Sequence, residues 1–497
     1  MEDRSIVVIV DKRIVKDSIY SVIRSLGSFL FPVITFSYAS RIFLADGIGK
    51  INFARSTISI ISMISMLGIT LYGIRECAKR RDDKEALSKL FSELLSINLI
   101  STALSYVILF IFVESSSKAG DYKSEIYLFS TGILLNVIGV GWLYTGVGDY
   151  RYLAVRSLIV QLISLLAVVA FVHRKEDIST YIIICVTASG GSNIIAFFHA
   201  RKYVHVRKIR FRDLWFHIKP IFSIFLVTIF INIFTDMDTV MVGFLSTETE
   251  VGLYSASYKI SAVLCKIISS ATTIIMPRIA YDFEKREDNK ANELLKISIQ
   301  YICLVGLPLA VGSCVYSRNF IALLSGESFN KATLSSEILS IRSLISPINC
   351  MLLLNYLIPR NNDKEAIVIS FVAALGNVVL NACLIPLYGA VGASIGTVVA
   401  EIIEFIVMSK YIRKHTKFSF IFENAFHYTV AVLPVTIVSI ATLSIKHDIF
   451  SIVLGVAISV PIYAIILRLL KNQYFESGLS MIKGMLVHRH KHNQSVQ

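Results

Sequence analysis

The chain has 497 residues, of which 55% are hydrophobic and 17% are charged, and its mean hydropathy is +0.66. A soluble domain has about 45–50% apolar residues, so this composition excludes an ordinary soluble globular protein. The formal net charge is +14, which is typical of nucleic-acid-binding proteins as well as of many membrane proteins, so the placement of the basic residues has to decide between them.

Long apolar stretches recur along the chain and are separated by short polar connectors. A helix needs about 20 apolar residues to cross the hydrocarbon core of a bilayer, and about fourteen stretches meet this requirement. They lie at residues 17–41, 52–73, 90–113, 124–146, 152–172, 178–200, 214–235, 251–277, 296–317, 332–358, 365–386, 390–411, 424–444 and 449–470. These runs are too continuous for the strands of a barrel, so the sequence predicts an all-α, polytopic membrane protein.

Basic residues cluster in alternate connectors, and the connectors between these clusters are poor in Lys and Arg. The clusters lie at residues 12–16, 75–84, 201–212, 285–290 and 410–417. This alternation is the positive-inside pattern, and it predicts that both termini are cytoplasmic and that the number of spans is even. Because topology already explains the charge, no nucleic-acid partner is expected.

Signals for catalysis and for metal binding are missing from the sequence. There is no GxSxG, HExxH or P-loop motif, and the longest connectors, near residues 201–213 and 278–295, are short and basic. The seven cysteines are scattered without a CxxC motif, and the basic tail at 488–492 is expected to touch lipid head groups. We therefore expect a protein that is not an enzyme and that has no metal site and no cofactor.

Basic residues inside the first two spans lie on polar stripes. Arg24 shares one helical face with Asp17, Ser21 and Ser28, and Arg55 shares another with Asn52, Ser59 and Ser62. Ionisable residues within a span are costly and mark a substrate pathway or a paired structural contact. Arg24 and Arg55 are therefore candidate substrate-binding residues, and the alternative is that they snorkel to an interface or pair with a carboxylate.

The eighth span carries Lys259 and Lys266, which are seven residues apart and therefore lie on the same helical face. Together with Arg24 and Arg55 they suggest a positively charged cavity. Arg342 on the tenth span has two interpretations, because it can line this cavity or pair with an acid.

Two acids are candidates for coupling transport to protons or Na⁺. Asp236 ends a polar stripe on the seventh span, and Glu401 follows Ser394 and Thr397 at helical spacing on the twelfth. The structural alternative for Glu401 is a hydrogen bond to the amide of Asn377 or Asn381 on the neighbouring span.

An internal repeat favours a transporter. The segments FLADGIGKINFARSTIS, from Phe43, and FLSTETEVGLYSASYKIS, from Phe244, both consist of a short loop, a glycine and a helix with a basic residue about one turn in. They precede spans two and eight, so each six-span half holds one copy. Two repeated bundles are the usual plan of an alternating-access carrier.

Four segments of the sequence are together typical of one family of membrane proteins. They are GIRECAKRRDDKEALSKLFSE at 73–93, GWLYTGVGDYRYLAVRS at 141–157, ETEVGLYSASYKIS at 248–261 with MPRIA at 276–280, and NACLIPLYGAVGASIGTVVAE at 381–401. With these segments the chain resembles the polysaccharide transporter branch of the multidrug/oligosaccharidyl-lipid/polysaccharide exporters, and more narrowly the Wzx-type flippases of O-antigen. The resemblance covers essentially the whole chain.

The resemblance implies a monomer of two six-helix lobes in a V shape, formed by residues 1–213 and 214–418, with residues 419–497 forming two extra spans and a cytoplasmic tail. It implies a bacterial inner-membrane flippase that moves an undecaprenyl-pyrophosphate-linked oligosaccharide to the periplasmic leaflet. The implied partners are the bilayer, the polysaccharide polymerase and the chain-length regulator. A pyrophosphate group needs cations in a low-dielectric cavity, which the basic residues on the spans would supply.

Three rival functions stay open. A drug/cation antiporter of the MATE type shares the lobed plan, but it should have carboxylates deep in its N-terminal lobe, where this sequence has arginines. A lipid II flippase is also cationic inside, and the segment at 73–93 favours the oligosaccharide branch over it. A membrane-embedded polymerase or ligase would need a large outer loop, which the sequence lacks.

Overall fold

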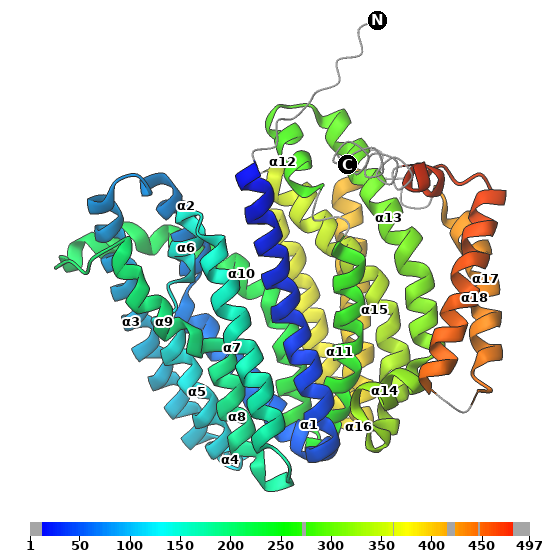
Figure 1. The fold of residues 1–497 in the computed structure, drawn as a ribbon, viewed down its shortest axis with the longest axis horizontal. Coiled ribbons are helices and arrows are strands. Elements are labelled where there is room, and N and C mark those ends of the chain that lie inside the picture. The colour runs from blue at the N-terminus through cyan, green and yellow to red at the C-terminus, as the bar shows by residue number, and fades with distance from the viewer. Residues whose placement is uncertain (1–11, 271–274, 361, 415–422, 446–447, 481–497) are drawn as a thin grey trace, which may run out of the picture. The chain divides into compact units, whose positions relative to one another are not determined.

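The structure is a computed structural model that describes residues 12–270, 275–360, 362–414, 423–445 and 448–480. These residues form helices and connectors without a strand (Figure 1), which confirms the predicted all-α class. The chain divides into two compact units, Met1–Phe244 (unit 1) and Leu245–Gln497 (unit 2). The predicted lobes 1–213 and 214–418, the segment 419–497 and the V-shaped arrangement remain predictions.

Unit 1 contains ten α-helices within the described residues. They are α1 (Lys12–Met66), α2 (Ile69–Arg80), α3 (Lys84–Ser115), α4 (Ser117–Gly120), α5 (Lys123–Val137), α6 (Gly141–Val147), α7 (Tyr150–Phe171), α8 (Ile178–Val186), α9 (Ser192–His199) and α10 (Phe211–Leu245), the last of which ends one residue into unit 2. One core of this unit gathers around Tyr72, Leu94, Trp142 and Tyr144 from three of these helices.

Unit 2 contains eight α-helices within the described residues. They are α11 (Glu248–Ser270), α12 (Met276–Glu284), α13 (Asp288–Val315), α14 (Ser317–Ser325), α15 (Thr333–Leu352), α16 (Asp363–Arg413), α17 (Ala425–Thr442) and α18 (Asp448–Leu469). Their core includes Ile299, Leu352, Tyr356 and Met408, and a π-helical stretch, Leu353–Leu357, follows α15.

Each predicted span falls on one or more of these helices. Eleven helical stretches of the described residues are long and apolar enough to cross a membrane, and two of them, Leu30–Arg80 and Asp363–Arg413, have 51 residues each. Each stretch has too many residues for a single span, and each contains a non-helical residue, Leu44 or Gly389, so each provides two spans. With α10, whose 35 residues cover the predicted seventh span, the helices are consistent with fourteen spans.

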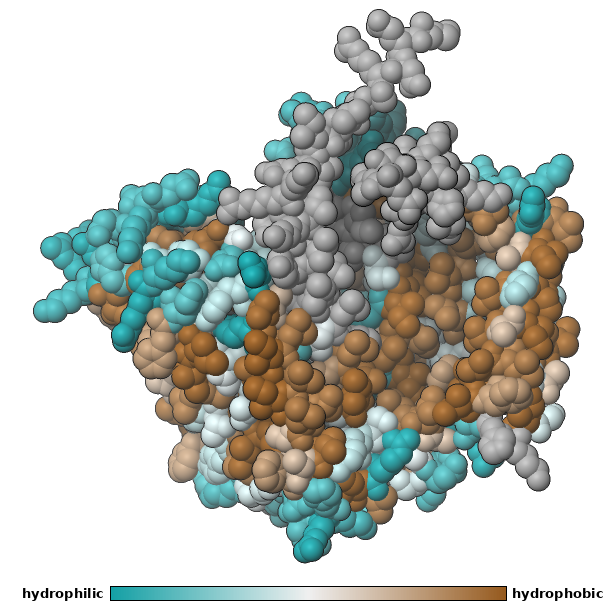
Figure 2. Space-filling model, in the orientation of Figure 1, coloured by the Kyte–Doolittle hydropathy of each residue, from teal (hydrophilic) through white to brown (hydrophobic). Residues whose placement is uncertain are grey.

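Large apolar side chains point outward along the spans. On α7, Ile159, Leu162, Ile163 and Leu166 are 53–63% exposed, and in Figure 2 hydrophobic surface covers the middle of the helices while hydrophilic residues lie at their ends. In water such a surface would be a liability, but in a bilayer it faces lipid. The surface of the molecule therefore agrees with the predicted membrane location.

Two long helices are broken where the chain has to turn back. Leu44 interrupts α1 with φ 57°, and Gly389 interrupts α16 with φ 53°. At Gly389 a β-carbon would lie 2.4 Å from Oε2 of Glu250, and this oxygen accepts the backbone N–H of Ala390 at 2.7 Å. Glu250 thus caps the second half of α16, which explains why the segment PLYGAVGAS has glycine at this point.

The segment at 141–157 forms a polar and aromatic junction. The Asp149 carboxylate accepts the backbone N–H of Tyr152 at 3.2 Å, which caps α7, and it accepts the hydroxyl of Tyr203 at 2.8 Å. Burial and this hydrogen bond to the acid raise the pKa of Tyr203 to about 12. Asp149 of this segment therefore has a structural role, since it caps α7 and binds the Tyr203 hydroxyl.

Candidate functional site

A buried polar network occupies the interior of unit 2, where α11, α15 and α16 pack together. Its centre is Arg342, whose Nε lies 3.4 Å from Oε1 of Glu401, with the two side chains only 12% and 13% exposed. The guanidinium is also 4.6 Å from the ring centroid of Tyr258, and its Nη2 donates to the Tyr258 hydroxyl at 3.1 Å. Of the two interpretations of Arg342, the structure shows the ion pair with an acid.

The face of α11 that meets Arg342 is polar. Nη1 donates to Ser261 Oγ at 3.3 Å and lies 3.6 Å from Cys265 Sγ. Tyr258, Ser261 and Cys265 follow one another at spacings of three and four residues, so they lie on one side of the helix. One turn before Tyr258, the Tyr254 hydroxyl lies 3.0 Å from Thr397 Oγ1 of α16.

A second acid joins the network through an amide. Asn349 Nδ2 lies 2.9 Å from Glu401 Oε2 and 3.3 Å from Glu404 Oε2, and it also donates to the Glu401 backbone carbonyl at 2.9 Å. The other oxygen of Glu404 accepts from Ser370 at 3.5 Å. The sequence had assigned the amide partner of Glu401 to Asn377 or Asn381, whereas the structure places Asn349 of α15 there.

The charges of this network do not balance when both acids are ionised. One guanidinium faces two carboxylates, so the group has a formal charge of −1 unless it binds one proton or one cation. In a low-dielectric interior an uncompensated charge is expensive. With both acids ionised, the network would therefore call for one further positive charge.

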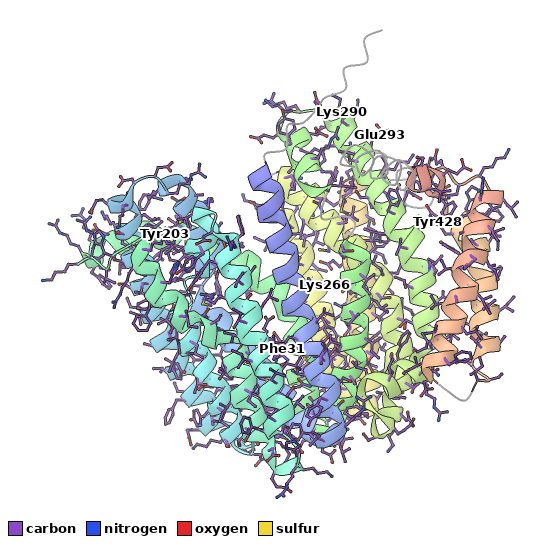
Figure 3. All side chains as sticks on the ribbon, in the orientation of Figure 1. Phe31, Tyr203, Lys266, Lys290, Glu293 and Tyr428 are labelled. Atoms are coloured by element: carbon purple, nitrogen blue, oxygen red, sulfur yellow. The ribbon has the colours of Figure 1, made fainter. Side chains whose placement is uncertain are left out.

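The two lysines of α11 differ in exposure. Lys259 is half-buried, whereas Lys266, which is labelled in Figure 3, is exposed. Lys266 lies within electrostatic range of the Cys350 thiol of α15. Its ammonium group is therefore presented on the outside of the helix packing of unit 2, close to α15.

In unit 1, Arg55 and Asp236, which the sequence analysis named as separate candidates, lie within electrostatic range of each other. The Ser59 hydroxyl of α1 donates to Asp236 Oδ2 of α10 at 2.6 Å, and Arg55 acts electrostatically on the same carboxylate. Arg55 itself is exposed. Arg24 lies on α1, but its side chain is outside the described residues.

A polar triad that the sequence analysis missed ties α2, α3 and α10 together. The Tyr72 hydroxyl lies 2.7 Å from Nδ1 of His217, and Nε2 of His217 lies 2.9 Å from Oε2 of Glu93. All three residues are at most 5% exposed. The available signal was a glutamate and a histidine within or beside apolar spans, but their pairing across 124 residues could not be derived from spacing.

Among the described residues, no group of three or more His, Cys, Asp or Glu side chains could hold a metal ion. The network in unit 2 is built from one guanidinium, two carboxylates, an amide and hydroxyl groups.

Comparison with known proteins identifies relatives over most of the chain. The family described as "Polysaccharide biosynthesis protein" matches residues 14–281, which is more than half of the chain. The chain is 22% identical over 405 residues to an Escherichia coli (strain K12) protein named "Putative O-antigen transporter", covering 80% of this chain and 97% of that protein. It is 21% identical over 197 residues to a Haloferax volcanii protein named "Probable low-salt glycan biosynthesis flippase Agl15", covering 40% of this chain and 42% of that one.

A solved structure shares the fold. The chain matches "Lipid II flippase MurJ, inward closed conformation" with a TM-score of 0.73 at 14% identity, over 91% of this chain and 99% of that chain. At this identity the likeness shows the fold alone.

Proposed function

Because this chain belongs to the polysaccharide biosynthesis protein family, we propose that it moves an undecaprenyl-pyrophosphate-linked oligosaccharide from the cytoplasmic to the periplasmic leaflet of a bacterial inner membrane. The chain is a transporter of polysaccharide biosynthesis and not an enzyme, because it belongs to this family and its relatives are named as transporters and flippases. The observation that carries the finer proposal is the presence of exposed cations on membrane-spanning helices.

Arg55 and Lys266 are those cations, since both are exposed on spans of their respective units. A pyrophosphate group carries negative charge that is poorly solvated inside a bilayer, and charge-assisted hydrogen bonds from Arg and Lys would stabilise it. Arg24 and Lys259 belong to the same proposal on sequence grounds. We also propose that the protein works as a monomer, with the polysaccharide polymerase and the chain-length regulator as partners.

Arg342 has a different role in this proposal. Its guanidinium already contacts Glu401, Tyr258 and Ser261. In this proposal Arg342 therefore positions the acids and does not bind the pyrophosphate. Glu401 and Glu404 would take up and release one proton or Na⁺ during each alternating-access cycle, which changes the charge of the network by one unit. Asp236 is a second candidate for coupling, held by Ser59.

The test uses cells that lack the protein. They should accumulate lipid-linked oligosaccharide facing the cytoplasm and lose surface polysaccharide, while their sensitivity to cationic dyes stays unchanged. Purified protein in vesicles should then move the lipid-linked oligosaccharide between leaflets. Dye hypersensitivity together with normal surface polysaccharide would instead support the drug/cation antiporter.

A further inference from the structure

A pocket of about 750 Å³ opens at the end of unit 2. It is formed by α12, the connector to the start of α13, the 3-10 turn Ile358–Arg360 with Asn362 just before α16, and the C-terminal part of α16. Its polar lining comes from residues of all these elements. The residues used below are Glu284, Arg286, Asp288, Arg360, Asn362 and Tyr411. The volume lies within the range of about 300–1,000 Å³ that is usual for small-molecule sites.

Arg360 is held rigidly at the wall of this pocket. Its guanidinium lies 4.6 Å from the ring centroids of both Phe283 and Tyr356, and it forms an ion pair with Asp288 at 3.2 Å. Its Nη1 donates to the Tyr356 hydroxyl at 3.0 Å, while the buried Nε has no hydrogen-bond partner among the described residues. A guanidinium held in this way presents a fixed positive charge at the wall of the pocket.

Arg286 occupies a position where glycine is usual. It follows the end of α12 with φ 60°, its N–H donates to Phe283 O at 3.0 Å, and the N–H of Glu287 donates to Asp282 O at 2.9 Å. This is the left-handed helix-end motif in which glycine avoids steric strain. An arginine in this conformation is strained, and such strain is a pointer to function when the side chain also lines a pocket.

The charges of the lining select the chemical class of the ligand. Arg286 and Arg360 contribute +2, whereas Glu284 and Asp288 contribute −2, so the formal charge of the pocket lining is zero. A phosphate would face two carboxylates and a cationic ligand would face two guanidinium groups. A neutral polyhydroxyl ligand fits both, because each hydroxyl donates to carboxylates and accepts from guanidinium and amide groups.

We propose that this pocket binds the carbohydrate part of the lipid-linked substrate. The inference rests on the proposed function, which supplies a sugar at this face of the membrane, and on the basic connector at 285–290, which the positive-inside rule assigns to the cytoplasm. Asn362 and the carboxylates of Glu284 and Asp288 would bond the hydroxyl groups, and Tyr411 would offer an apolar face to a sugar ring.

The experiment measures binding to the full-length protein in lipid nanodiscs. The probe is the oligosaccharide released by mild acid from the lipid-linked intermediates of the source strain, and the reading is its dissociation constant. Arg286→Gly is the decisive variant, because glycine favours the backbone conformation and only the side chain is lost. We expect Arg286→Gly and Asn362→Ala each to weaken oligosaccharide binding at least fivefold. The control is Lys290→Ala, which removes a cation that pairs with Glu287 outside the pocket lining (Figure 3) and should bind as the native protein does.

The outcomes separate this inference from the proposed function. Equal binding by the native protein and by Arg286→Gly would overturn the pocket as a sugar site, as would the absence of oligosaccharide binding by protein that moves the lipid-linked form in vesicles. Displacement of the oligosaccharide by inorganic pyrophosphate, with loss of pyrophosphate binding in Arg286→Gly, would identify an anion site and also overturn it. Oligosaccharide binding that depends on Arg286 in a protein without flipping activity would retain the pocket and reject the flippase.

Discussion

At the scale of single residues, the ion pair between Arg342 and Glu401 is the contact whose loss should lower the stability of the protein most. Because both side chains are almost fully buried, Arg342→Gln leaves Glu401 without its counter-charge and should lower the free energy of unfolding by about 3–5 kcal/mol. Glu404→Gln, which removes the excess charge and keeps the shape, should have a much smaller effect. Thermal unfolding of the purified variants in detergent measures both. An unchanged melting temperature for Arg342→Gln would show that the pair is not stabilising.

The exposed cation of α11 leads to a functional prediction instead. Lys266→Ala should sharply reduce surface polysaccharide while protein abundance stays normal, because an exposed lysine contributes little to stability but its charge would bind pyrophosphate. Lys266→Arg should keep most of the activity, and Lys266→Glu should be worse than alanine. Arg24→Ala and Lys259→Ala are expected to act in the same direction.

The control, Lys123→Ala, removes a lysine that pairs with Glu114 at a connector, and should leave the polysaccharide unchanged. Full surface polysaccharide in Lys266→Ala would exclude this lysine from the substrate site.

At the scale of elements, the break in α16 requires glycine at position 389. Gly389→Ala places a β-carbon against the Glu250 carboxylate and forces an L-residue into the left-handed region, which alone destabilises by roughly 1–2 kcal/mol. Gly312→Ala is the matched control, because it lies inside α13 with nothing within 4 Å of the added carbon, and it should stabilise by up to about 1 kcal/mol. The melting temperatures of the two variants should move in opposite directions. A shift of the same sign in both would mean that Glu250 moves away without a penalty.

The helices themselves could be predicted because apolar length and polar spacing are local properties of the sequence. Every predicted span overlaps one or more helices of the described residues, and Arg342 pairs with an acid, which is one of the two interpretations that its sequence position allowed. The partners could not be predicted, because spacing gives the face of a helix but not the helix that packs against it. This is why Glu401 was assigned an amide from its preceding span and instead bonds Asn349 of α15, and why Glu93 and His217 were not connected. The kink at Leu44 could not be predicted either, because nothing in the sequence indicates that a leucine will have a positive φ.

At the scale of the whole molecule, the alternating charge of the connectors makes a prediction about orientation. A reporter that is active only in the periplasm should work when inserted near Glu248, at the start of α11, and fail near Arg207 or near Lys285, which lie in basic connectors before α10 and after α12. The physical reason is that Lys and Arg are retained on the cytoplasmic side during insertion. The spans also require this result, because one span separates Arg207 from Glu248 and another separates Glu248 from Lys285. Reporter activity at Arg207 would therefore overturn the orientation of the chain, and with it the assignment of the polar pocket of unit 2 to the cytoplasmic face.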